Sequence, residues 1–146
     1  MDRNINLAWR PLAAAMALAF LASGAYSVAA MGADIKVTLS GTEEVPPVTT
    51  KATGSGTVMI GNDGAVSGTI TTKDIAGTAA HIHEAAAGKN GGVIVPMTKS
   101  GDDGWTFAAG AKLTDAQMAA LKAGNLYINV HTAANPGGEI RGQLKP

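Results

Sequence analysis

Apolar and polar positions alternate along most of the chain after residue 34, and this alternation predicts short β-strands. Ile35, Val37 and Leu39 alternate with Lys36 and Thr38, the period-two pattern of a strand with one buried face. Similar segments follow at 57–60, 66–72, 78–83, 93–97, 105–108, 126–131 and 139–144. About eight short strands separated by glycine-rich turns predict an all-β, antiparallel, Greek-key-like sandwich or barrel.

One segment departs from the strand pattern and predicts a helix. In 114–117 a threonine is followed three residues later by a glutamine, which is the spacing of a capping box. Gly124 stands where the end of a helix favours glycine. We therefore predict one short helix over 115–123, with Met118 and Leu121 packed on the core.

The first 30 residues resemble a secretory signal peptide. Two arginines make the start positive, 11–21 is an apolar run, and 27–30 supplies the small residues that a signal peptidase needs. The alternative is an uncleaved membrane anchor, but the run is shorter than the about 20 residues that span a bilayer. We expect cleavage after Ala30, with Ala29 and Ala33 as near alternatives.

Cleavage would leave residues 31–146 as one periplasmic or secreted domain with no membrane span. The full chain has 146 residues with 11 basic and 11 acidic side chains, and this neutral balance argues against a nucleic-acid binder. The chain has no cysteine, which excludes disulfides, thiol chemistry and zinc ribbons. Any metal site must therefore use nitrogen, oxygen or thioether ligands.

All three histidines of the chain fall in two predicted strands. His81 and His83 are two residues apart, so their side chains project from the same face. In 126–131 the apolar residues alternate with Tyr127, Asn129 and His131, which share the opposite face. If these two strands are neighbours in the sheet, the three imidazoles can meet at one ion. Periodicity fixes the face of each strand but not its neighbour, so the adjacency is an assumption.

Three imidazole ligands with an open fourth position suit copper or zinc. Copper(II) binds such ligands more tightly than the other divalent first-row ions, so copper is the first choice and zinc the second. Glu44, Glu84 and Asn129 are the candidates for groups that hydrogen-bond and orient the rings. Met97 is a possible thioether ligand, although methionine more commonly packs in the core.

The competing interpretation needs no metal. In it the histidines form a structural hydrogen-bonding group, with Asn129 or the Thr132 hydroxyl as a partner. The protein would then be an extracellular interaction module with a protein partner or a second copy of itself.

Four motifs resemble those of the CHRD (chordin-type) domain family. They are 39–48 (LSGTEEVPPV), 80–83 (AHIH) with Asn90-Gly91 after it, 126–132 (LYINVHT) and 135–144 (NPGGEIRGQL). Glu84 departs from the glycine that commonly follows the second motif. The resemblance implies a secreted all-β module. It does not carry over the growth-factor binding of chordin to a lone domain.

These observations predict a periplasmic or secreted metal-binding protein for copper sequestration, delivery or tolerance through His81, His83 and His131. A comparison with copper/zinc superoxide dismutase fails, because the dinuclear site of that family uses six histidines and this chain has three. A weak redox activity at a single copper ion is a third interpretation, so whether the protein is an enzyme stays open.

Overall fold

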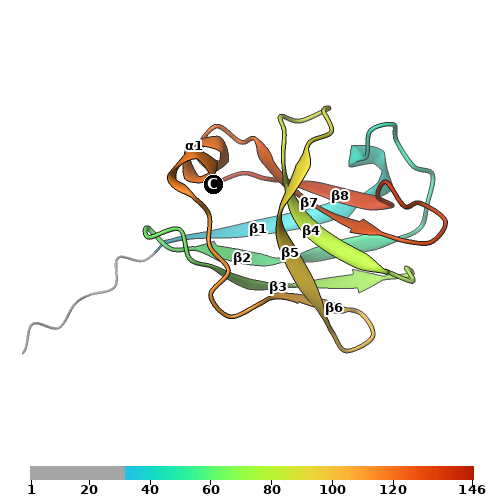
Figure 1. The fold of residues 1–146 in the computed structure, drawn as a ribbon. Coiled ribbons are helices and arrows are strands. Elements are labelled where there is room, and N and C mark those ends of the chain that lie inside the picture. Colours follow the sequence, from blue (N-terminus) through green and yellow to red (C-terminus); the bar gives the residue numbers. More distant parts are fainter. Residues whose placement is uncertain (1–31) are drawn as a thin grey trace, which may run out of the picture.

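The computed structural model describes residues 32–146, in which eight antiparallel strands close into one barrel (Figure 1). The strands are β1 (Ala33–Ser40), β2 (Thr53–Ile60), β3 (Val66–Lys73), β4 (Ala79–Glu84), β5 (Gly92–Ser100), β6 (Gly104–Phe107), β7 (Leu126–His131) and β8 (Ile140–Leu144). Around the barrel they follow the order β1-β2-β3-β6-β5-β4-β7-β8. The prediction of an all-β antiparallel fold is confirmed, in its barrel form.

Two connections skip strands, which makes the topology Greek-key-like. β3 pairs with β6 instead of β4, and β4 lies between β5 and β7. The chain therefore lays down β4, β5 and β6 back toward β3 and then crosses to place β7 beside β4. This crossing brings β4 and β7 together, although β5, β6 and the helix separate them in sequence.

The inward side chains of the strands form the hydrophobic core. On β7, Leu126, Ile128 and Val130 have no exposed surface, as the period-two pattern predicts. Met97 of β5 belongs to the same core. Its thioether therefore has the packing role that is more common for methionine.

The predicted helix is confirmed as α1 (Asp115–Lys122). Thr114 Oγ1 accepts a hydrogen bond from the Gln117 backbone N–H at 3.2 Å, and Gln117 Oε1 accepts one from the Thr114 backbone N–H at 2.9 Å. This is the capping box that the spacing indicates. Gly124 follows with a φ of +72°, a conformation that favours glycine. A 3-10 helix, η1 (Gly41–Glu43), was not predicted.

The predicted signal peptide, residues 1–30, lies outside the described residues. Cleavage after Ala30 therefore stays a prediction. Within residues 32–146, no helix is long and apolar enough to cross a membrane.

Loops cover part of the outer wall of the barrel. Asn90, in the loop after β4, donates a hydrogen bond from Nδ2 to the Val45 carbonyl in the loop after β1, at 2.7 Å. Beneath this contact, Tyr127 and Asn129 point outward from β7 and are nevertheless almost completely buried. A layer of buried polar side chains therefore lies between the barrel wall and these loops.

Candidate metal centre

The two strands that carry the histidines are neighbours. β4 and β7 pair antiparallel, with His81 opposite Asn129 and His83 opposite Tyr127. His131 ends β7 on the same outward face. The adjacency assumed from the sequence is confirmed, and the topology brings all three imidazoles together.

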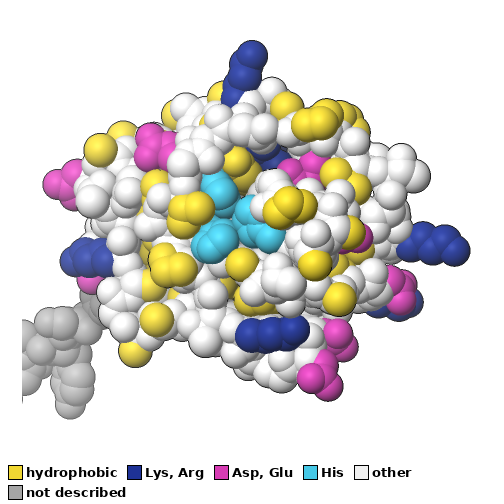
Figure 2. Space-filling view, turned by 45° about the vertical axis from the view of Figure 1, so that its right-hand side comes forward, with side chains coloured by type: hydrophobic (Ala, Val, Ile, Leu, Met, Phe, Trp, Pro, Cys, Tyr) yellow, Lys and Arg dark blue, Asp and Glu magenta, His cyan; other side chains and the backbone are white. Residues whose placement is uncertain are grey.

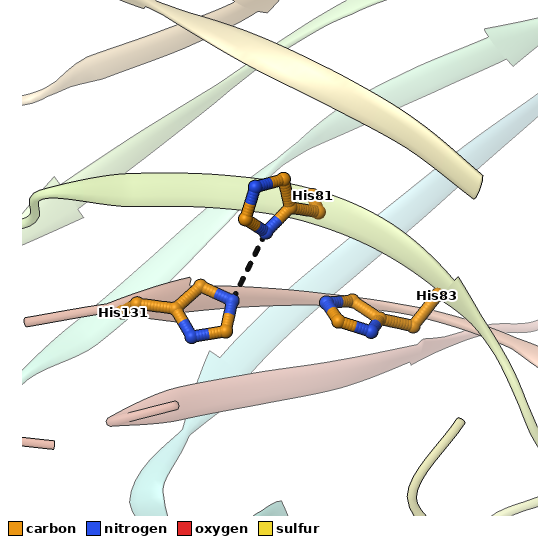
Figure 3. Close-up of side chains that lie close together, drawn as sticks. All are labelled: His81, His83 and His131. Atoms are coloured by element: carbon orange, nitrogen blue, oxygen red, sulfur yellow. Dashed lines mark hydrogen bonds between the residues drawn. The ribbon is translucent and has the colours of Figure 1, made fainter. Parts of the chain in front are cut away.

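The imidazole rings converge at distances that suit a single ion (Figure 3). One nitrogen from each ring can be chosen so that all three lie within 4.8 Å of one another. Nδ1 of His81 and Nε2 of His131 are 3.0 Å apart. Two nitrogens that each lie 2.0–2.1 Å from one ion are about 2.8–3.6 Å apart for bond angles between about 90° and 120°. The closest pair therefore already has the separation that a shared ion requires.

Backbone carbonyls determine which nitrogen two of the rings can offer. His83 donates a hydrogen bond from Nδ1 to the Gly91 carbonyl at 3.0 Å, and His131 donates one from Nδ1 to the Pro136 carbonyl at 2.9 Å. Because a carbonyl can only accept, each neutral ring carries its proton on Nδ1 and keeps a lone pair on Nε2. Such second hydrogen bonds are typical of histidines that bind metals.

His81 is held differently. Its hydrogen bond runs between Nδ1 and Nε2 of His131, and since that Nε2 is an acceptor, His81 Nδ1 is the donor in the metal-free protein. Binding an ion through Nδ1 requires the His81 proton to move to Nε2. The same contact therefore supports two states, a hydrogen-bonded pair of rings and a pair of ligands.

The surroundings favour the neutral forms of His81 and His83. Burial lowers the pKa of His81, and the neighbouring His131 and His83 lower it further. Burial also lowers the pKa of His83, against the opposing effect of its hydrogen bond to Gly91. Neutral rings offer lone pairs to a metal without first losing a proton.

The centre opens to solvent on one side. Figure 2 shows the histidine side chains as one continuous patch on the surface, with hydrophobic side chains around it. His81 and His131 are half-buried, whereas His83 is 7% exposed. An ion bound here could take a further ligand from solvent.

His83 is the first member of a stack of three side chains, with Tyr127 next and Arg141 beyond it. The Tyr127 ring is nearly parallel to His83, with an interplanar angle of 11° and centroids 5.0 Å apart. Arg141 Cζ lies 3.4 Å from the centroid of the Tyr127 ring. Because β7 lies between β4 and β8, His83 and Arg141 approach Tyr127 from neighbouring strands on either side.

Arg141 is 1% exposed and belongs to the polar layer beneath the loops. It donates hydrogen bonds from Nη1 to Asn90 Oδ1 at 3.3 Å and from Nη2 to Gln143 Oε1 at 3.3 Å. Glu44 is the carboxylate whose charge interacts with it. The burial of Arg141 comes from the loops, which strand periodicity does not describe.

The residues proposed to orient the rings lie at different places. Asn129 is 2% exposed and sits among the histidines. Glu44 is 5% exposed and lies beside Asn129, and burial raises the pKa of its carboxyl to about 7. Glu84 is exposed at the end of β4. Among the hydrogen bonds of residues 32–146, none joins the carboxylate of Glu44 or Glu84 to an imidazole.

A comparison with protein-family models matches the CHRD domain over residues 35–144. The matched region contains all three histidines and covers nearly the whole barrel. Neither the comparison with curated proteins nor that with solved structures finds a match.

Proposed function

The chain belongs to the CHRD domain family, and we propose that it binds copper through His81, His83 and His131. The observation that carries the proposal is the orientation of the rings. His83 and His131 each donate Nδ1–H to a backbone carbonyl, so that Nε2 of both rings is an unprotonated ligand.

The donor set supports copper ahead of zinc. Three imidazoles bind either ion, but the affinity of copper(II) for nitrogen ligands exceeds that of zinc. The pair formed by His81 and His131 matches the spacing of ligands on one ion, and an open side leaves room for exchange of the ion. We propose sequestration, delivery or copper tolerance as the role, outside the cytoplasm, where the predicted signal peptide would direct the chain.

The test is a competition titration of the tag-free protein with copper(II), copper(I) and zinc(II) against a chelator. We expect one tight copper site per chain, weakened by orders of magnitude in His83→Ala, His81→Ala and His131→Ala. Asn62→Ala, in the exposed turn between β2 and β3, is the control and should bind as the wild type does, since neither strand neighbours β4 or β7.

The metal-free interpretation predicts a different result. The hydrogen bond between His81 and His131 also fits a purely structural cluster. In that case no ion binds tightly, and His83→Ala lowers the stability of the protein by about 1–3 kcal/mol through the loss of a buried hydrogen-bonding group. The titration together with a denaturation curve of the same variants distinguishes the two.

A further inference from the structure

Asn129 occupies the middle of the histidine cluster. It lies directly opposite His81 in the strand register, and His83 is two residues further along β4. His131 is two residues further along β7, on the same face. Asn129 is therefore the neighbour of all three histidines in the sheet.

A backbone carbonyl orients the Asn129 side-chain amide. Nδ2 donates a hydrogen bond to the Gly137 carbonyl at 3.3 Å. The Glu44 carboxyl lies beside this amide, but among the described residues its buried Oε1 has no hydrogen-bond partner. Rotating the amide by 180° would set Oδ1 against the Gly137 carbonyl, so Oδ1 points the other way.

Two buried acceptor atoms remain at this point without a hydrogen bond. Among the atoms of residues 32–146, neither Asn129 Oδ1 nor His83 Nε2 has a hydrogen-bond partner. The two side chains are diagonal neighbours in the pairing of β4 with β7, on the same outward face, because Asn129 pairs with His81 and His83 with Tyr127. Both are acceptors when the ring is neutral, because the His83 proton is on Nδ1.

Two neighbouring buried acceptors need a shared positive charge or a donor, since leaving such groups unpaired destabilises the folded protein. A metal ion bound to His83 Nε2 would satisfy both. We propose that Asn129 Oδ1 is a fourth ligand of the ion, which makes the centre a three-nitrogen, one-oxygen site. This inference rests on the proposed metal-binding function. It adds a ligand that determines whether the centre prefers copper(II) or copper(I).

A neutral amide oxygen is a harder donor than imidazole and favours copper(II) over copper(I). We expect Asn129→Ala to weaken copper(II) binding by about 10–100-fold and copper(I) binding by less. Asn129→Asp places a charged oxygen at the same position and should strengthen copper(II) binding. Asn62→Ala and Asn62→Asp, in the exposed turn between β2 and β3, are the matched controls, and both should leave the affinities for the two ions unchanged.

The wild-type protein provides a second measurement that does not depend on the folding of a variant. In isotope-labelled protein titrated with zinc(II), direct coordination should shift the Asn129 side-chain ¹³Cγ resonance together with the ¹⁵N resonances of the three imidazoles.

Three results separate the possibilities. Shifted imidazoles with an unshifted Asn129 ¹³Cγ would overturn the fourth ligand, and so would equal losses of copper(II) and copper(I) affinity in Asn129→Ala. Either outcome would leave the three-histidine site intact. If neither copper ion nor zinc binds the wild type, the proposed function itself fails.

Discussion

At the scale of single residues, two backbone carbonyls decide which ring nitrogens are available to a metal. The carbonyls of Gly91 and Pro136 take the Nδ1 protons of His83 and His131. Both belong to loops, so strand periodicity cannot reveal them. The sequence predicts which residues could be ligands, and the loops determine which atoms are.

The buried carboxyl of Glu44 should make the stability of the protein depend on pH. Burial raises its pKa from 4.5 to about 7 in the folded protein. Its contribution to stability is therefore fully present below pH 4.5 and is lost as the pH rises through about 7.

Glu44→Gln removes this ionisation. As the pH rises from 4.5 to about 7, we expect the unfolding free energy of the wild type to fall relative to that of the variant. Urea denaturation at several pH values measures the difference, in which the contributions of groups that both proteins share largely cancel. A difference that stays constant across this range would contradict the raised pKa.

A second prediction at the residue scale concerns the effect of adding a side chain at Gly138. Its φ is +130°, and a Cβ there would lie 2.5 Å from both Asn129 Nδ2 and Glu44 Oε1. Gly138→Ala should therefore destabilise the fold and displace the Asn129 amide, with loss of metal affinity. Gly137→Ala is the matched control, because a Cβ there meets nothing within 4 Å. Thermal unfolding and chelator competition on both variants measure the two effects.

At the scale of elements, the existence of the strands and the capped helix could be predicted, but strand neighbours could not. Some strand ends also differ from the prediction: β2 begins at Thr53 instead of 57, and β5 continues to Ser100 instead of 97. Alternation places His81, His83 and His131 on outward faces, yet it contains no information about pairing. β4 and β7 meet because the chain crosses the barrel between β6 and β7. The burial of Arg141 escaped prediction for a similar reason, since it depends on loops that fold over the outer wall.

At the element scale, a substitution at the start of α1 should change the stability of the fold without changing copper affinity. α1 precedes the first residue of β7, whereas His131 is its last. Thr114→Ala removes the side-chain half of the capping box and should lower stability by about 1 kcal/mol. Copper affinity should not change. Thr114→Ser, which keeps the hydroxyl, should retain most of the stability, and loss of metal affinity in Thr114→Ala would show that α1 and the centre are coupled.

At the scale of the whole molecule, the barrel is held without disulfides, because the chain has no cysteine. An ion that binds the folded state adds stability by mass action. When free copper exceeds the dissociation constant a hundredfold, the gain is at most about 2.7 kcal/mol, less any binding to the unfolded chain. Chemical denaturation with and without the ion measures this gain. His83→Ala should show almost none of it, and an equal gain in that variant would place the ion elsewhere.

The hydrogen bond between His81 and His131 has a consequence for the protons exchanged with the solution. When an ion replaces this bond, the His81 proton can move from Nδ1 to Nε2 of the same ring, so the protein need not release it. At a pH well above the pKa of about 7 of the nearby Glu44 carboxyl, where that group has already lost its proton, loading of the centre should therefore be proton-neutral. Each buffer also binds the metal, and the heat of that reaction must first be subtracted. The remaining heats of binding should then be the same in buffers with small and large enthalpies of ionisation.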